Sequence, residues 1–364
     1  MRFPRATIDR AALRHNLGVV RAMAPGSRVI AVIKANGYGH GLVETARALT
    51  GADAFGVARL DEGLALRAAG IVNEIVLLEG VFSSEELQLA SAARLQLVVH
   101  SFEQLQLLEQ ACDIPSSQDS SGGFTVWLKI DTGMNRLGFR REEFETAWQR
   151  LRRCRCVRTA RVMTHLAAAE EPDSPATRGQ IESFRALTDS LNVERSVANS
   201  AGLIASPQAR VDWVRPGLML YGISPIPSQS AAQLGLRPAM TLTTQIIALR
   251  RVPKAESVGY SAIWRASRDS VVGIAAIGYG DGYPRNMRNG TPVLVNGKEV
   301  SVVGRVSMDM TAIDVTNSGD VRVGDPVVLW GEGLPAERVA PYADTISYEL
   351  VCGISQRVAV EWQG

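Results

Sequence analysis

The chain has 364 residues, of which 46% are hydrophobic and 21% charged, and its formal net charge is +2. This length exceeds one typical hydrophobic core and predicts two domains, while the small net charge gives no electrostatic reason to expect nucleic acid or an anionic membrane as a partner. The first residues do not resemble a secretory signal and no apolar run approaches the ~20 residues of a membrane span, so we expect a cytoplasmic protein.

From about residue 10 to residue 230, short β-rich runs alternate with helical patterns. Eight strand candidates follow one another: Val29–Lys34, Ala54–Ala58, Ile75–Leu78, Leu95–Val99, Thr125–Asp131, Val157–Thr164, Ser196–Ala198 and Asp212–Arg215. Segments between them, such as Leu60–Ala69 and Ser83–Ala93, carry apolar residues at helical spacing. This alternation predicts a (β/α)8 barrel of the TIM type. A doubly wound open sheet is the alternative that periodicity leaves open.

After Pro238 the pattern changes to β-rich runs with turn signals between them. The runs are Met240–Val252, Val271–Ile277, Pro292–Val295, Val300–Val303 and Val327–Trp330. Asn296-Gly297 between two of them is a strong hairpin signal. We therefore assign residues 1–235 to the barrel and 236–364 to a C-terminal, mostly β domain, with a linker near 224–235. Whether the first few residues pack with the β domain stays open.

The ends of the predicted barrel strands carry the first chemical signal. Lys34 ends the first strand, and active sites of such barrels lie where strands end. A half-buried lysine there is a candidate for covalent cofactor attachment, although a lone lysine at a strand end is more often solvated. The segments 199–202 and 215–217 follow strands seven and eight, the recurrent phosphate site of this fold, and small residues there admit an anion. Together these features suggest pyridoxal phosphate.

Seven motifs resemble, in order and spacing, those of the alanine racemase family: VIKANGYGHG, LKIDTGMNRLGF, VANSAG, WVRPGLMLYG, VGYSAIW, IGYGDGYPR and GRVSMDM. The likeness covers essentially the whole chain. No single motif is specific, since IGYGDGY alone is a common kind of glycine-rich turn. Their shared order is what makes the resemblance specific.

The resemblance implies pyridoxal 5'-phosphate as cofactor and two acid/base residues on opposite faces of the substrate Cα. Lys34 matches the cofactor lysine and the first base. Tyr260, in VGYSAIW, matches the second base, which in this family reaches into the barrel of the other subunit. Racemisation needs two such groups because the proton leaves one face and returns on the other. The resemblance therefore also implies a homodimer with shared active sites.

Further positions match residues that support this chemistry. His165 matches the histidine that connects Tyr260 with Arg215. Arg215 matches the arginine that donates to the pyridine nitrogen of the cofactor, and arginine can only donate, so the ring stays neutral. Arg136 matches the residue that binds the substrate carboxylate. Lys129 matches a lysine often carbamylated in the family, whose negative charge would position Arg136.

The remaining positions concern the cofactor phosphate and the entrance. The phosphate would be bound by Tyr38, Ser200, Gly217, Leu218 and Tyr348. Met308 matches a substrate-contacting residue from the second subunit, with Asp309 beside it. Tyr279 and Tyr348 match aromatic residues that narrow the entrance, which would favour a methyl-sized side chain.

Other functions share part of this pattern. A barrel-type amino acid decarboxylase pairs an acidic residue with the pyridine nitrogen, where this chain has Arg215. A racemase of broader amino acid specificity is a nearer alternative. A non-catalytic pyridoxal-phosphate carrier resembles the barrel alone. Four histidines and scattered carboxylates show no metal-ligand spacing, so we expect no metal. Whether D-alanine is made for peptidoglycan or degraded stays open.

Overall fold

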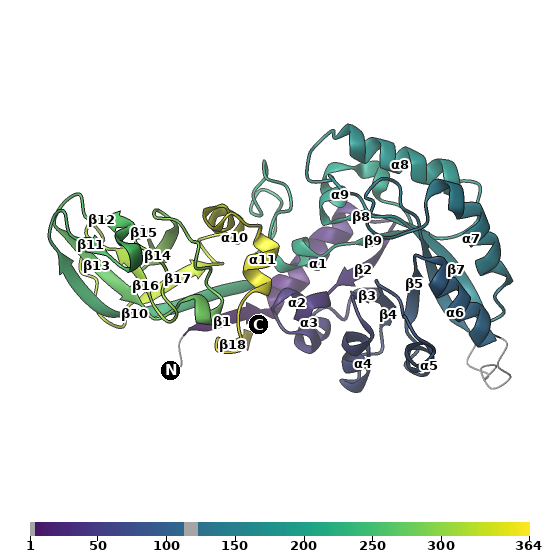
Figure 1. The fold of residues 1–364 in the computed structure, drawn as a ribbon, viewed down its shortest axis with the longest axis horizontal. Coiled ribbons are helices and arrows are strands. Elements are labelled where there is room, and N and C mark those ends of the chain that lie inside the picture. Colours follow the sequence, from purple (N-terminus) through teal and green to yellow (C-terminus); the bar gives the residue numbers. More distant parts are fainter. Residues whose placement is uncertain (1–3, 113–122) are drawn as a thin grey trace.

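A computed structural model describes residues 4–112 and 123–364 of the chain. It consists of a closed parallel barrel and a mainly antiparallel sheet, which lie at opposite ends of the long axis (Figure 1). The C-terminal end of the chain lies near the middle, where the two parts meet (Figure 1). None of the helices in the described residues is long and apolar enough to cross a membrane.

The eight predicted barrel strands are confirmed, with ends that differ by one or two residues. They are β2 (Arg28–Val32), β3 (Ala54–Val57), β4 (Glu74–Leu77), β5 (Gln96–Val99), β6 (Phe124–Lys129), β7 (Val157–Met163), β8 (Arg195–Asn199) and β9 (Trp213–Arg215). Neighbouring strands pair in parallel, and β2 pairs with β9 to close the barrel. The open sheet is therefore excluded. Because the strands are parallel, their carboxyl ends meet at one rim of the barrel.

Helices surround the barrel; the first precedes the barrel strands and the others follow them. They are α1 (Arg10–Met23), α3 (Leu42–Ala48), α4 (Leu60–Ala68), α5 (Ser84–Ala92), α6 (Phe102–Cys112), α7 (Arg141–Arg153), α8 (Pro175–Thr188) and α9 (Ser200–Ala205). Local sequence explains several starts: Ser83 caps α5 by accepting from the backbone N–H of Glu86, and Pro175 occupies the first turn of α8. A single turn, α2 (Lys34–Tyr38), follows the first barrel strand.

The inside of the barrel is filled near the amino ends of the strands. Trp127 and Trp213 are fully buried there, and the Arg161 guanidinium lies 5.1 Å and 4.9 Å from their rings. Arg161 also pairs with Glu194, which precedes β8, at 2.6 Å. The barrel is thus closed by a packed, charge-paired layer at this end, and space for a ligand lies at the carboxyl rim.

The second part is an eight-stranded sheet in the order β13-β16-β15-β14-β17-β10-β1-β18. Its strands are β1 (Arg5–Asp9), β10 (Met240–Val252), β13 (Ser270–Ala275), β14 (Pro292–Val295), β15 (Lys298–Val302), β16 (Thr311–Asp314), β17 (Pro326–Trp330) and β18 (Ala359–Gln363). A separate small hairpin joins β11 (Ser257–Val258) and β12 (Trp264–Arg265). Asn296 and Gly297 connect β14 to β15 with φ of 50° and 77°, which confirms the predicted hairpin.

Three further features concern this second part and its connection to the barrel. The strand β1 lies between β10 and β18, so residues 5–9 pair with the strands of the second part. Short helices α10 (Ala336–Val339) and α11 (Ser347–Cys352) interrupt the β pattern. Between the one-turn helix η3 (Leu218–Tyr221) and β10, no helix or strand is formed. The exact domain division at residue 235 stays a prediction.

Helix α11 packs directly against the turn α2 of the barrel. Gly39 ends that turn with φ +79°, and a Cβ at this position would lie 2.0 Å from the carbonyl oxygen of Val351 in α11. Only glycine permits so close a backbone approach in this conformation. The β domain therefore lies beside the carboxyl rim of the barrel.

Candidate active site

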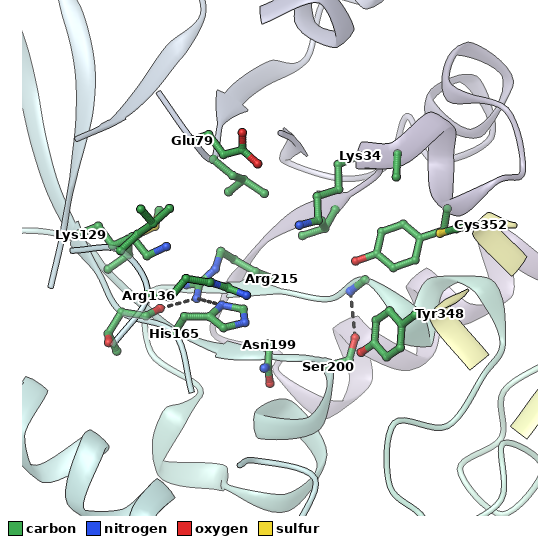
Figure 2. A pocket seen from close by; sticks show the side chains of 18 residues that line it. Lys34, Glu79, Lys129, Arg136, His165, Asn199, Ser200, Arg215, Tyr348 and Cys352 are labelled. Atoms are coloured by element: carbon green, nitrogen blue, oxygen red, sulfur yellow. Dashed lines mark hydrogen bonds between the residues drawn. The ribbon is translucent and has the colours of Figure 1, made fainter. Parts of the chain in front are cut away.

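A cavity of about 500 Å³ opens at the carboxyl rim of the barrel (Figure 2). Loops after six barrel strands and helix α11 contribute its wall: Val32, Lys34, Ala35, Tyr38, Leu78, Glu79, Lys129, Arg136, Leu137, Met163, Thr164, His165, Asn199, Ser200, Arg215, Gly217, Tyr348 and Cys352. This is the position at which barrel enzymes carry their active sites.

The charges around the cavity are unequal. Figure 2 shows Lys34, Lys129, Arg136 and Arg215 gathered around one space. Glu79 is the one carboxylate in the wall of this cavity. Four cationic side chains against one carboxylate favour a ligand with several negative charges. A phosphate together with a carboxylate would satisfy this donor set, so the residues present fit a phosphorylated cofactor bound beside an amino acid.

Lys34 is half-buried and begins an unusual backbone turn. Residues 35–39 all have positive φ, between 52° and 79°, and form one left-handed turn. This conformation costs roughly 1–2 kcal/mol for each non-glycine residue. The turn is held by hydrogen bonds, including one from Ala35 N to Glu62 Oε1 at 2.7 Å and one from Leu42 N to Asn36 Oδ1 at 3.0 Å. It brings Lys34 and Tyr38 into the same cavity.

Arg215 ends β9 and is only 5% exposed. Its Nη1 donates to Ser196 Oγ at 2.6 Å, and its Nη2 donates to Val197 O at 3.3 Å. Nη2 also donates to His165 Nδ1 at 3.4 Å (Figure 2). Burial lowers the pKa of Arg215 to about 10, so the guanidinium remains protonated at neutral pH. Because arginine can only donate, His165 Nδ1 must accept, and the imidazole proton is on Nε2.

His165 is neutral as well as oriented. Burial lowers its pKa well below the ordinary value, and the positive charges of Arg215 and Lys129 act in the same direction. A neutral histidine with its proton on Nε2 can donate one hydrogen bond on the side away from Arg215. The predicted contact between His165 and Arg215 is therefore present.

One end of the cavity, here called the small-residue end, is formed by Ser200 and Gly217 together with Tyr38. The backbone N–H of Gly217 donates to Ser200 Oγ at 2.9 Å (Figure 2). Asn199 caps α9 by accepting from the N–H of Gly202 at 2.8 Å, which fixes Ser200 as the first residue of the helix. A Cβ on residue 217 would lie 2.4 Å from Tyr38 Oη, so glycine lets this hydroxyl approach the backbone.

Two tyrosines from different domains face this end. Tyr38 and Tyr348 have ring centroids 5.9 Å apart, and burial raises the pKa of both hydroxyls, to about 12 for Tyr348. Both hydroxyls are therefore protonated at neutral pH and can donate to an anion. Hydroxyl groups and backbone N–H groups beside a helix start suit a phosphate.

Lys129 lies on the opposite wall and is 9% exposed. Burial and, to a smaller extent, the neighbouring charges of Arg215 and Arg136 together lower its pKa to about 8. The uncharged fraction of Lys129 near neutral pH is therefore larger than that of an ordinary lysine.

The predicted site residues divide into two groups. Those in the wall of the cavity are Lys34, Tyr38, Lys129, Arg136, His165, Ser200, Arg215, Gly217 and Tyr348. Those outside it are Leu218, Tyr260, Tyr279, Met308 and Asp309. Leu218 is buried in η3 directly after Gly217, whereas the other four lie on the β domain. Tyr260 is 65% exposed and Met308 52% exposed, and Asp309 pairs with Arg357.

Sequence reasoning missed several residues of the wall. Cys352 stands four residues after Tyr348 on α11, so helical spacing alone placed it on the same face. Glu79 follows β4 at the carboxyl rim, where the barrel pattern should have drawn attention to it. Asn199 was seen only as part of a phosphate motif, and its role as a helix cap was not predicted.

Comparisons with known proteins agree along the whole chain. A family model described as alanine racemase, N-terminal domain, matches residues 8–225, and one described as alanine racemase, C-terminal domain, matches residues 239–362. The alanine racemase of Aeromonas hydrophila is 51% identical over 358 residues and that of Aliivibrio salmonicida 50%, each alignment covering 98% of both chains. The crystal structure of the biosynthetic alanine racemase from Pseudomonas aeruginosa superposes with a TM-score of 0.95 at 44% identity, covering 100% of both chains. The chain belongs to the alanine racemase family, isomerases that interconvert L- and D-alanine.

Proposed function

We propose that this enzyme racemises alanine with pyridoxal 5'-phosphate bound in the cavity, and that Lys34 and Tyr260 move the proton on opposite faces of the substrate Cα. The observation that carries the proposal is the position of Lys34 in a cavity with three further cations and with the small residues Ser200 and Gly217 at one end. When bound, the cofactor withdraws electrons from the substrate and makes the Cα proton acidic.

Lys34 serves one face of the substrate. Lys34 is half-buried and stands at the start of the left-handed turn. The backbone of this turn is fixed because Glu62 and Asn36 accept hydrogen bonds from backbone N–H groups. A fixed backbone limits the positions of the amine, so the proton moves along a defined path. The same lysine provides the covalent attachment of the cofactor.

The opposite face requires a second group, which we assign to Tyr260 of a second copy of this chain. The tyrosines in the cavity wall, Tyr38 and Tyr348, have raised pKa values and are poor bases. Tyr260 is exposed on the β domain of its own chain, as is Met308. In the proposed homodimer, the partner's Tyr260 enters the cavity and accepts a hydrogen bond from His165 Nε2.

Arg215 sets the charge at the inner end of the cofactor. Its guanidinium is protonated and donates to Ser196, Val197 and His165, which fix its plane. Arg215 would hold the bound cofactor by donating a hydrogen bond to its ring nitrogen. Because a guanidinium can only donate, that nitrogen would stay unprotonated, and the cofactor would supply weaker electron withdrawal that favours return of the proton to Cα.

Arg136 and Lys129 lie on the side of the cavity that we assign to the substrate. Arg136 presents a planar fork that suits the alanine carboxylate. The neutral Lys129 amine, favoured by its pKa of about 8, adds to carbon dioxide, forming an N–C bond and releasing a proton to solvent. The resulting carbamate is negative and would orient Arg136 instead of repelling it.

The phosphate is assigned to the small-residue end. Its partners would be the hydroxyls of Tyr38, Ser200 and Tyr348 and the backbone N–H groups of Gly217 and Leu218. Tyr279, Met308 and Asp309 of the second subunit would border the entrance and limit the size of the substrate side chain.

The test is chiral chromatography of L-alanine incubated with pyridoxal phosphate and protein. Wild type should reach an equal mixture of enantiomers, and Lys34→Ala and Tyr260→Phe should each fail while their melting curves stay cooperative. Mixing the two variants after dissociation should restore about a quarter of the wild-type rate, because half of the dimers are mixed and each has one intact site. Absence of restoration would contradict the shared site.

A further inference from the structure

Three buried polar atoms meet at the contact between the barrel and the β domain, here called the seam. They are Nε2 of His40, Nε1 of Trp330 and Oε2 of Glu337, and none has a hydrogen-bond partner among the described residues. His40 follows the turn α2, Trp330 ends β17, and Glu337 lies in α10. His40 and Trp330 are both 0% exposed. Unpartnered buried polar atoms are rare and costly, so this group requires an explanation.

The proton on His40 can be placed from its one bond. Its Nδ1 lies 2.9 Å from the carbonyl oxygen of Tyr38, and because a carbonyl can only accept, Nδ1 carries the hydrogen. Burial lowers the pKa of His40 to about 4, so the ring is neutral at neutral pH. Nε2 is therefore a lone-pair acceptor that needs a donor.

The other two atoms require opposite hydrogen-bond partners, one an acceptor and the other a donor. The indole N–H of Trp330 can only donate, and the carboxylate oxygen of Glu337 accepts. The second oxygen of Glu337 is already used, since it accepts from the backbone N–H of Ala231 at 3.2 Å. The group thus requires a ligand that donates twice and accepts at least once. A cation is excluded because it would face the indole N–H, and an anion is excluded because it would face the histidine lone pair and the carboxylate.

The space between these residues has the size of one small molecule. His40, Trp330 and Glu337 all line a cavity of about 10 Å³, whose other walls include Tyr221, Ile223, Met240 and Val351. This volume matches a single water molecule, which needs two to four polar partners in a buried site. Water also has the required two donors and one acceptor.

We propose that one ordered water molecule is bound at the seam, where it accepts from Trp330 Nε1 and donates to His40 Nε2 and Glu337 Oε2. The water joins the β domain to the residue that supports Tyr38. His40 donates to the Tyr38 carbonyl, and its ring contacts that of Tyr221 in a tilted arrangement with centroids 4.5 Å apart. Tyr221 in turn stacks on Tyr38 at 4.7 Å. Through these contacts the water is a positioning element for the turn that carries Tyr38.

The direct test is a crystal structure of the dimeric holoenzyme at a resolution that reveals ordered solvent. A single density peak within hydrogen-bonding distance of all three atoms is the expected result. A direct bond between any two of them, or a peak with only one partner, would overturn the site. This readout does not depend on the function of the cavity.

The functional test compares Trp330→Phe with Trp148→Phe, a matched loss of a buried indole in α7 far from the seam (Figure 1). Cofactor affinity, read by absorbance titration, should weaken about threefold to tenfold in Trp330→Phe only, the range for one lost hydrogen-bonded link. The turnover rate at saturating cofactor should stay near that of wild type in both. Equal affinities in the two variants would refute the positioning role.

A second variant covers the case in which Trp330→Phe does not fold. Glu337→Ala removes one partner from the half-buried side of the site and leaves both aromatic rings in place. It should weaken the density peak and lower cofactor affinity, and unchanged density and affinity would count against the proposal. The affinity readout rests on the proposed cofactor site, whereas the density readout does not, so the two failures are distinguishable.

Discussion

The fold makes the positive charge of Lys129 costly, and this cost can be measured as a pH dependence of stability. Its folded-state pKa of about 8 lies below the ordinary 10.5 because of burial and three neighbouring cations. Between these two pH values the unfolded chain binds more protons than the folded chain, so the free energy of unfolding rises with pH. The difference between the two pKa values corresponds to about 3 kcal/mol in the free energy of unfolding, which the protein lacks below pH 8 and has regained by pH 10.5.

We therefore expect Lys129→Met to raise the free energy of unfolding by up to about 3 kcal/mol near neutral pH and to remove most of the rise above pH 8. The assay is urea unfolding of cofactor-free protein in buffer without carbon dioxide, because an anionic ligand or a carbamate would relieve the same repulsion. Adding bicarbonate should stabilise wild type and leave the variant unchanged.

The exposed Lys254 provides the matched control, since Lys254→Met removes one ammonium without burial. Its pH curve should run parallel to that of wild type. If the Lys129→Met curve also ran parallel, with no gain in stability near neutral pH, the reasoning about burial and repulsion would be refuted.

Three further substitutions test other parts of the structure. Gly217→Ala places a Cβ 2.4 Å from Tyr38 Oη and should weaken cofactor binding by about 1–3 kcal/mol in an absorbance titration, whereas Gly179→Ala, with no atom within 4 Å, should not. Asn16→Ala removes three hydrogen bonds to backbone groups near the domain junction and should lower the free energy of unfolding by about 2–4 kcal/mol; a loss below half of this would contradict it. Arg215→Lys cannot reproduce the forked contacts of a guanidinium. It should lower the rate of racemisation about tenfold to hundredfold, both from L- to D-alanine and from D- to L-alanine, and wild-type rates would argue against the role of Arg215.

The barrel was predictable because its signal is repeated eight times in local sequence. The differences occur where the backbone leaves standard geometry. The first strand was expected to reach Lys34 but ends at Val32, because the chain then enters the left-handed turn. Non-glycine residues such as Ala35 and Asn36 rarely adopt positive φ, so no propensity predicts this turn. Tertiary contacts hold it in place, and these are not visible in the sequence.

The site was predictable where its residues come from strand ends and less so where distant segments meet. Lys34, Arg215 and Ser200 follow from the barrel pattern together with the family motifs. His40 lines the same small cavity as Trp330 and Glu337 although these segments are almost 300 residues apart in the sequence, and this proximity has no local signal. Tyr260 was expected in the site but lies on the surface of its own chain, a placement that tests neither the role nor the dimer.

The pairing of β1 between β10 and β18 determines the order in which a growing chain can complete the molecule. Arg5 lies opposite both Thr243 and Ala359, so β1 has no strand neighbour until the entire barrel, which lies between them in the sequence, has been synthesised. Barrel contacts can form during synthesis, whereas β1 gains its second neighbour only when β18 has been made. Helix α11, which contributes Tyr348 to the cavity, directly precedes that strand. A chain interrupted before α11 would therefore contain a barrel but not a finished cavity.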